Sequence, residues 1–238
     1  MEFIFLKLKK NGEIFLGQYS TKGLYSGYKK NNKEREALDY YSTPTKEVEN
    51  ILSSSNISLK GKTILEPCVG GGHMLQGIVN YLNDVRALPH KIIATDVMDR
   101  QPQVKDESNL ILPKIEYKLG SDYDFLSDNY PYNKADIVIM NPPYSTIEPF
   151  VIRALEIAPE VLLLGRIQFI ESESRFENIL KHNPFNEMYQ YVDRIQCYKN
   201  GDESIKGSSA QGYAWFYWNK NYPKLQPYIK WLRRSDKQ

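Results

Sequence analysis

The sequence lacks most of the features that would assign a chain to a special class of protein. Cysteine is scarce, and Cys68 and Cys197 stand in contexts too different to define a disulfide framework. No apolar run approaches the roughly 18 residues that a membrane span needs. The chain begins MEFIFLKLKK, with an apolar stretch before the lysines, which is the reverse of a secretory signal peptide. We therefore expect a protein of a reducing cytoplasm.

The number of histidines and the net charge are also low, and each limits the classes of function that the sequence favours. The three histidines, His73, His90 and His182, show no metal-ligand spacing, so we expect no metal site. A net charge of +2 does not by itself indicate a nucleic-acid-binding protein. Basic residues do gather near both ends of the chain, above all in residues 220–238. Contact with phosphates and simple solvation of the chain ends explain that pattern equally well.

The hydrophobic content of 41% is enough for one full-sized domain with a core. Residues 1–39 are predicted to form a β-hairpin that turns at Asn11-Gly12, followed by a loose, charged connector. Residues 221–238 are predicted to be a basic C-terminal tail. The domain itself is therefore expected to span residues 40–220.

Short apolar segments alternate with helical patterns through this domain. The alternation predicts a doubly wound, mostly parallel seven-stranded sheet with helices on both faces. Only a loop joins the last two strands, so they should pair antiparallel. The aromatic run at residues 215–218 is expected to be core rather than a stacking surface. The predicted strands are residues 62–66, 91–96, 115–120, 135–140, 160–165, 188–198 and 213–219, and the predicted helices are residues 43–52, 72–83, 147–157 and 172–181.

Candidate ligand-binding residues follow the first three strands, because open α/β sheets bind ligands at the carboxyl ends of their strands. Residues 66–72 (EPCVGGG) form a glycine-rich turn, where the backbone could approach a ligand closely. Asp96 could accept the two hydroxyls of a ribose. Asp124 and Phe125 could bind the amino group and the face of an adenine ring. Each feature has an ordinary alternative: a plain turn, a helix-capping or turn aspartate, and a solvated turn with one buried phenylalanine.

The most specific motif is Asn141-Pro142-Pro143-Tyr144, after the fourth strand. Its prolines fix the backbone in a rigid, extended turn. They hold two acceptors, the Asn141 side-chain oxygen and a proline carbonyl, beside an aromatic ring. An aromatic amine is a poor nucleophile, because its lone pair is delocalised into its ring. Two acceptors on its N–H bonds would favour the pyramidal form and aim the lone pair at an electrophile, while Tyr144 stacks on the base.

An isolated motif of this kind could be only a proline turn that ends a strand. Here it follows the glycine-rich turn in the right order. Glu-Pro-x-x-Gly-x-Gly at residues 66–72, followed by Asn-Pro-Pro-Tyr at 141–144, resembles the adenine-N6 DNA methyltransferases, in the arrangement where the cofactor loop precedes the catalytic motif. Residues 40–44 (YYSTP) resemble the family's first cofactor-contacting segment, and residues 164–175 and 212–216 (GYAWF) are similar to the small members found in bacteriophages and prophages.

The similarity covers residues 40–220. It implies a Rossmann-like class I methyltransferase fold, S-adenosylmethionine as the cofactor, and DNA methylation, alone or within a restriction-modification system. A phage-encoded member would act in the host cytosol. The implied catalytic residues, which would receive the flipped base, are Asn141, Pro142, Pro143 and Tyr144. The implied cofactor-binding residues are Tyr41, Thr43, Pro44, Glu66, Pro67, Cys68, Gly70, Gly72, Asp96, Asp124 and Phe125.

Within the cofactor set the resemblance assigns individual positions. Thr43 and Pro44 would line the methionine end of the cofactor. Glu66, Pro67, Gly70 and Gly72 would cradle its amino-acid moiety. Asp96 would hold the ribose, and Asp124 with Phe125 the adenine ring. We interpret Cys68 as a small residue of the cofactor loop, because no activating base is recognisable near it in the sequence.

The implied partner is DNA, either a duplex from which the base is flipped or a single strand. Larger members carry a separate target-recognition domain, which is missing here. What remains is the hairpin, residues 97–114, the loop 199–212 and the basic tail. The recognised DNA sequence would then be short or loosely defined, or its recognition would be supplied by a second copy of the chain or by a specificity partner.

Other functions stay open at this stage. RNA adenine is an alternative substrate. Protein glutamine is another, although enzymes acting on it resemble each other through an Asp-Leu-Gly-type loop and not through Glu-Pro. A catalytically inactive fold that binds nucleic acid would show damage to at least one cofactor element, and none is evident in the sequence.

Overall fold

The computed structural model describes residues 3–8, 14–19, 40–105, 113–202, 204, 211–222 and 227–237. The chain divides into two compact units, residues 1–35 and residues 36–238. In the first unit, β1 (Phe3–Leu8) and β2 (Ile14–Tyr19) pair antiparallel, as the hairpin prediction requires. The predicted Asn11-Gly12 turn and the charged connector up to residue 39 lie outside the described residues.

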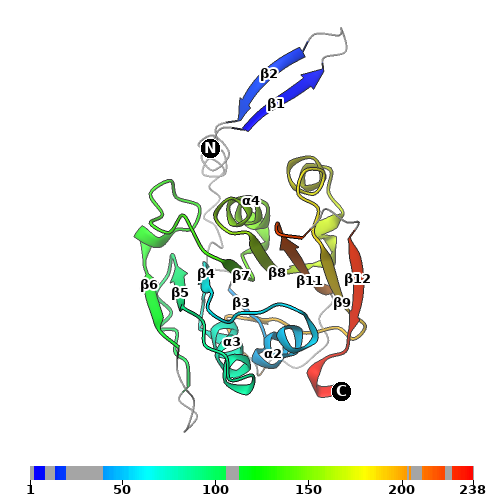
Figure 1. The fold of residues 1–238 in the computed structure, drawn as a ribbon. Helices are drawn as coiled ribbons and strands as arrows, with labels where there is room; N and C mark the ends of the chain where they lie inside the picture. The colour runs from blue at the N-terminus through cyan, green and yellow to red at the C-terminus, as the bar shows by residue number, and fades with distance from the viewer. Residues whose placement is uncertain are drawn as a thin grey trace. The chain divides into compact units, whose positions relative to one another are not determined.

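The second unit is built on one large sheet (Figure 1). Its strands are β4 (Thr63–Glu66), β5 (Lys91–Asp96), β6 (Ile115–Leu119), β7 (Ile137–Met140), β8 (Glu160–Arg166), β9 (Glu187–Tyr191), β11 (Tyr213–Asn219) and β12 (Tyr228–Leu232). Their order across the sheet is β12-β9-β11-β8-β7-β4-β5-β6. Neighbours from β8 to β6 pair parallel, whereas β11 pairs antiparallel with both β8 and β9. The doubly wound, mostly parallel sheet with an antiparallel last hairpin is therefore confirmed.

Helices cover both faces of this sheet (Figure 1). They are α2 (Thr45–Ser54) and α3 (His73–Asp84) on one face and α4 (Ile147–Ile157) on the other. Short 3-10 turns are η1 (Ser121–Tyr123), η2 (Tyr144–Thr146), η3 (Ile167–Ile170) and η5 (Ser235–Lys237). No helix within the described ranges is both long and apolar enough to cross a membrane.

The predicted helix at residues 172–181 takes a different form. A short α5 (Glu173–Arg175) continues directly into one π-helical stretch, η4 (Phe176–Leu180). The Ser172 side chain caps α5 by accepting from the Arg175 N–H, and the Lys181 N–H then reaches back five residues to the Phe176 carbonyl. A single-sequence pattern of apolar residues does not distinguish this widened turn from a regular helix.

The core lies between the sheet and the helices, and it explains why the central strands read as continuous apolar runs. All four residues of β7 (IVIM) are buried, as strands covered on both faces should be. The aromatic strand β11 is buried along its whole length, and Trp215 and Phe216 are 0% exposed. Trp215 Nε1 donates to Tyr191 Oη at 2.9 Å, which satisfies its polar atom. The core interpretation of the aromatic run is confirmed.

The long strand predicted for residues 188–198 is wrong. β9 ends at Tyr191, and residues 192–197 leave the sheet. The chain re-enters strand geometry as β10 (Tyr198–Lys199), which pairs antiparallel with β3 (Tyr41–Ser42) in a separate two-stranded ladder. Two apolar residues of the intervening segment, Ile195 and Cys197, are buried in the core without being sheet residues, whereas Val192 is exposed. Burial therefore produced a strand-like pattern where no strand forms.

Part of the predicted basic tail is an eighth strand of the sheet. β12 pairs parallel with β9, and Leu232 is buried. Its neighbouring cations are paired: Lys230 lies 2.9 Å from Glu187, Arg233 lies 3.8 Å from Asp193, and Arg234 pairs with Asp236. These pairs reduce the charge that this segment offers to phosphates.

Gly77 sets the distance between α2 and α3. A Cβ atom on Gly77 of α3 would lie 2.6 Å from the Thr45 carbonyl oxygen and 2.6 Å from the Val48 Cβ, both in α2. Real Cβ atoms do not approach other atoms this closely. α2 begins two residues after the buried residue Thr43, so this close packing also fixes the segment that precedes the helix.

We predict that Gly77→Ala lowers the free energy of unfolding by about 1–3 kcal/mol, as overpacking of a core does. The higher helix propensity of alanine would by itself act in the opposite direction, by roughly 1 kcal/mol. Asp84→Ala, at the exposed end of the same helix, is the control and should change stability little. Urea unfolding measures both. A Gly77→Ala protein as stable as the parent would contradict the close-packing argument.

Candidate functional site

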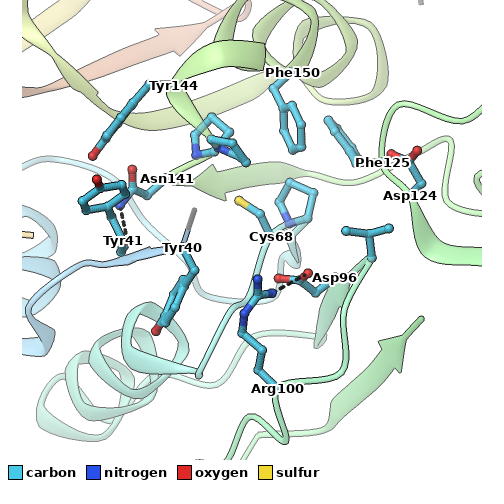
Figure 2. Close-up of a pocket in the computed structure, with 14 residues that line it drawn as sticks. Tyr40, Tyr41, Cys68, Asp96, Arg100, Asp124, Phe125, Asn141, Tyr144 and Phe150 are labelled. Atoms are coloured by element: carbon cyan, nitrogen blue, oxygen red, sulfur yellow. Dashed lines mark hydrogen bonds and ion pairs between the residues drawn. The ribbon is translucent and has the colours of Figure 1, made fainter. Parts of the chain in front are cut away.

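One pocket lies at the carboxyl ends of β4, β5 and β7, where the following loops converge (Figure 2). Because these strands are parallel neighbours, their ends meet at one edge of the sheet. We call this the main pocket. It is lined by Tyr40, Tyr41, Pro67, Cys68, Asp96, Val97, Arg100, Asp124, Phe125, Asn141, Pro142, Pro143, Tyr144 and Phe150.

A second, smaller pocket adjoins the first and shares Tyr40, Tyr41, Cys68 and Asn141 with it. We call this the side pocket. Its other lining residues are Ser42, Thr43, Glu66, Val69, His73 and Met74. The two pockets together bring most of the sequence-predicted residues into one place. Pro44, Gly70 and Gly72 line neither pocket: Pro44 precedes α2, and the two glycines shape the turn beneath.

The glycine-rich turn has a conformation that side chains would block. Gly70 has φ +55° and Gly72 has φ +89°, both in the left-handed region. A Cβ on Gly70 would lie only 2.1 Å from Cε2 of Tyr40, whose ring rests on the turn. The Tyr40 hydroxyl is 2.7 Å from Nδ1 of His73, the first residue of α3. The turn therefore has a closely fitted aromatic wall.

Glu66 ends β4 with an unusual carboxylate. The residue is 2% exposed, and its Oε2 atom is buried without a hydrogen-bond partner. Burial raises the pKa of Glu66 well above its ordinary value, and the nearby Asp96 carboxylate raises that pKa further. A buried carboxylate that lacks a partner is costly to the fold. It is therefore a candidate to receive a cation or a hydrogen-bond donor from a ligand.

Asp96 ends β5 and is held on both of its oxygens. Oδ2 accepts the Gly70 N–H at 2.9 Å, which ties the glycine-rich turn to the second strand. Oδ1 accepts the Met98 N–H at 2.9 Å and an Arg100 N–H at 3.2 Å (Figure 2). The same guanidinium lies 5.3 Å from the centre of the Tyr40 ring. The carboxylate is thus fixed in direction at the rim of the main pocket.

Asp124 and Phe125 lie together at the far end of the main pocket (Figure 2). Asp124 Oδ1 accepts the Leu126 N–H at 3.0 Å, a local turn bond that leaves the other carboxylate oxygen for a further partner. Phe125 is 2% exposed, and its ring centre lies 5.1 Å from that of Phe150 and 5.2 Å from that of Tyr130. This part of the pocket therefore combines an apolar wall with one carboxylate.

Asn141 follows β7, and the two ends of its amide differ. Its Nδ2 donates to the Tyr41 carbonyl and to Thr43 Oγ1, each at 3.0 Å. Its Oδ1 is buried without a hydrogen-bond partner. In Figure 2 this oxygen points toward the side of the Tyr144 ring. The amide is therefore locked in one orientation and presents an unused acceptor.

The prolines continue this rigid geometry. Pro143 has φ −54° and ψ 130°, an extended conformation, and its carbonyl accepts the Thr146 N–H at 3.0 Å as η2 begins. Pro142 lies between Asn141 and this turn and lines the main pocket. The corner therefore cannot relax without breaking the start of η2.

Tyr144 is held on several sides. Its hydroxyl donates to Tyr213 Oη at 3.0 Å, and its ring centre lies 5.6 Å from that of Tyr41. The Arg166 guanidinium carbon lies 4.1 Å from the ring centre. Burial, chiefly, raises the pKa of the Tyr144 phenol far above its ordinary value, so the hydroxyl stays protonated. Tyr144 is thus suited to be a fixed aromatic surface and not an acid or base.

Cys68 lines both pockets but is a poor nucleophile. Burial raises the pKa of its thiol well above the ordinary value, and the carboxylates of Glu66 and Asp96 raise it further. The thiolate is therefore disfavoured. Among the described residues, no group of three or more histidine, cysteine or carboxylate side chains could hold a metal ion.

The sequence analysis did not identify three residues of the main pocket: Val97, Arg100 and Phe150. It placed Tyr40 in the segment of residues 40–44 but gave it no role of its own. Arg100 lies four residues after Asp96, a spacing compatible with the ion pair that forms. Phe150 carries no local signal, because it reaches the pocket from α4 only after the helix packs on the sheet.

No protein-family model and no curated protein matches the chain, but many solved structures resemble it. A candidate RNA methyltransferase from Pyrococcus horikoshii is 20% identical with a TM-score of 0.55, over 84% of this chain and 99% of that one. A candidate class I S-adenosylmethionine-dependent methyltransferase from Listeria monocytogenes is 16% identical with a TM-score of 0.56, over 90% and 72%.

The M protein of the type I restriction enzyme EcoKI is 13% identical with a TM-score of 0.51. The match covers 81% of this chain and 48% of that protein, so the chain spans about half its length. At these identities the similarity establishes the fold and nothing finer. The chain has the Rossmann-like, class I methyltransferase fold that its sequence predicts.

The buried Glu66 leads to a prediction about stability. Its folded-state pKa is raised above the ordinary value of 4.5, so ionisation of this group opposes folding. The contribution of Glu66 to the free energy of unfolding is therefore fully present below pH 4.5, and it is lost as the pH rises through the folded-state pKa. Glu66→Gln removes that loss, so the variant should gain stability relative to the parent between about pH 5 and pH 8, by about 1 kcal/mol or more.

Thermal or urea unfolding across this pH range measures the difference. Glu171→Gln, at an exposed position, is the control and should follow the parent at every pH. If the difference between Glu66→Gln and the parent did not change with pH, the raised pKa of Glu66 would be disproved.

Proposed function

We propose that the chain is an S-adenosylmethionine-dependent methyltransferase that methylates the N6 amino group of adenine in DNA. One observation carries this proposal. Asn141 presents a buried oxygen without a partner, while its amide nitrogen is anchored twice. An acceptor held in this way is matched to a ligand that brings an N–H donor.

An adenine amino group has two N–H bonds and a lone pair that its ring withdraws. We assign one N–H to Asn141 Oδ1 and the other to the Pro142 carbonyl, because both belong to the same rigid corner. Accepting both bonds favours a pyramidal nitrogen, whose lone pair then points out of the ring plane. The positive charge that develops on this nitrogen is met by two preorganised dipoles, which need no rearrangement during the reaction.

Tyr144 supplies the plane on which the base would lie. Its ring lines the main pocket, and its hydroxyl is engaged with Tyr213 and not with solvent. Stacking on this ring fixes the base relative to Asn141, which is a gain in orientation. The amino group of adenine is paired inside a duplex, so the target must be flipped out or be single-stranded.

The residues present fit the cofactor. Glu66 Oε2 is a buried hydrogen-bond acceptor without a partner, and it is suited to the ammonium group of a methionine moiety. Asp96 stands at the end of β5, where a ribose would be held, and Phe125 offers an apolar wall to an adenine ring. When bound, S-adenosylmethionine supplies a methyl group activated by a sulfonium. The chain's own residues orient it by charge, by hydrogen bonds and by the exclusion of water.

Arg100 modifies the prediction for Asp96. Oδ1 of Asp96 already accepts from Arg100 and from the backbone, so a ribose would have to share or replace the guanidinium. Thr43 also differs from its predicted role, because its hydroxyl orients Asn141 as well as lining the side pocket. We propose that Thr43 links the cofactor side of the site to the base side.

DNA is favoured over RNA because Glu-Pro-x-x-Gly-x-Gly followed by Asn-Pro-Pro-Tyr resembles the adenine-N6 DNA methyltransferases. The test is an incubation of the protein with labelled S-adenosylmethionine and matched strands: duplex DNA, single-stranded DNA, RNA of the same sequence, and a glutamine-containing peptide. Mass spectrometry of the digested products identifies the modified group. Label in N6-methyldeoxyadenosine supports the proposal, whereas label only in RNA or in the peptide contradicts it.

We predict that Asn141→Ala lowers the rate of methyl transfer by at least about 100-fold, the scale for removing one group that stabilises a transition state. Cofactor affinity, measured by calorimetry, should change by less than about threefold, since Asn141 is assigned to the base. Asn129→Ala, an exposed loop asparagine, is the control and should retain activity. Equal loss of cofactor affinity and of rate would contradict the role of Asn141.

A further inference from the structure

Arg166, the last residue of β8, makes an unusual contact with the aromatic ring of the catalytic motif. Its guanidinium carbon lies 4.1 Å from the centre of the Tyr144 ring, the shortest such distance among the described cation–ring pairs. A guanidinium at this distance is attracted to the ring face. No role for Arg166 follows from the chemistry described so far.

Arg166 is held by the ring contact and by one neighbouring tyrosine. Arg166 Nε is buried and has no hydrogen-bond partner. The side chain does interact with Tyr213: burial raises the pKa of Tyr213, and a hydrogen bond to Arg166 partly opposes that rise. Tyr213 is the cross-strand partner of Arg166 in the β8–β11 ladder.

Two neighbouring strands therefore hold one ring from two directions. Arg166 of β8 covers the ring, and Tyr213 of β11 accepts from the Tyr144 hydroxyl at 3.0 Å. Burial raises the pKa of Cys197 to about 12, and hydrogen bonds with these two tyrosines oppose the rise, so its thiol belongs to the same cluster. The Tyr144 ring is thus fixed before any base arrives.

The location of Arg166 relative to the main pocket completes the argument. Tyr144 lines this pocket, and Arg166 is not among its lining residues. The guanidinium therefore covers a part of the ring that does not face the pocket. The pocket side of the ring lies beside Tyr41, whose ring centre is 5.6 Å away, and this is the side on which a base would lie.

We propose that Arg166 is a positioning residue for the target base, acting through Tyr144. The inference rests on the proposed function. Arg166 supports the ring from behind, so the base meets a surface of fixed tilt and loses less orientation on binding. Lysine would not replace it fully, because an ammonium lacks the planar group that lies flat on a ring.

The test uses the full chain and two strands. A strand that the parent protein methylates gives the KM, and the same strand with 2-aminopurine in place of the target adenine reports on base flipping. Arg166→Met should raise the KM for the strand and weaken the flipping signal by about threefold to thirtyfold, the range of a desolvated cation–ring contact. Arg166→Lys should fall between Arg166→Met and the parent. The affinity for S-adenosylmethionine should stay unchanged.

A matched control is Arg175→Met. Arg175 also lies over a ring, 5.5 Å from the centre of Phe169, and it also lies outside the main pocket. This variant should keep the KM and the flipping signal of the parent. Thermal unfolding of all variants identifies any that fail to fold. If Arg166→Met is one of them, Arg166→Lys is compared with the parent instead.

A double-mutant cycle with Tyr144→Leu separates positioning from direct contact. If Arg166 acts through the ring, Arg166→Met should cost less than about twofold once Tyr144 is replaced. The salt dependence of strand binding should also be unchanged, because loss of a phosphate contact would lower its slope by about one. A full effect in the Tyr144→Leu background, a lowered salt slope, or a parent-like Arg166→Met protein would each overturn the inference.

Failure of the proposed function gives a different result. A parent protein that methylates no adenine-containing strand disproves that function, and this inference with it. A fully active parent with an equally active Arg166→Met variant overturns the inference alone.

Discussion

The amide of Asn141 has two ends, and the fold treats them differently. The nitrogen is bonded to the Tyr41 carbonyl and the Thr43 hydroxyl, so the side chain cannot rotate to satisfy its oxygen elsewhere. The oxygen is therefore kept as an acceptor for an incoming donor. The rest of the site is arranged around this amide: Tyr41 and Thr43 hold its nitrogen, and the fixed ring of Tyr144 lies in the same corner of the main pocket.

Such an arrangement is maintained against a cost in stability. Asn141 Oδ1 and Glu66 Oε2 are both buried without partners, and each unsatisfied group opposes folding. The close packing of α2 on α3 at Gly77 and the buried aromatic strand β11 stabilise the frame that keeps these atoms in place. An ammonium group at Glu66 and an N–H donor at Asn141 would satisfy these two atoms, so ligand binding would recover the stability that they cost.

Much of the fold could be predicted from the sequence, because its signals are local. The strands at residues 91–96 and 213–219 and the helix at residues 147–157 have the predicted bounds, since period and turn residues mark them. Two predictions were wrong, because the local pattern of apolar or charged residues did not match the structure that formed. Residues 192–197 are partly buried outside the sheet, and β12 lies in a segment whose charges suggested a solvated tail. Local composition does not reveal which neighbour an edge strand will find.

For the site, the sequence alone determined which chemical groups are present and in what order. The Glu-Pro loop, Asp96 and the Asn-Pro-Pro-Tyr corner stand at the ends of the parallel strands β4, β5 and β7, and parallel strands end at the same edge. Only the tertiary structure decided which atoms remain unpaired. The bond from Asn141 to Thr43 joins residues 98 positions apart, and the contact of Arg166 with Tyr144 depends on packing between β8 and the turn after β7. Hydrogen bonds and ring contacts over such separations depend on distances that the folded chain creates and that no local pattern encodes.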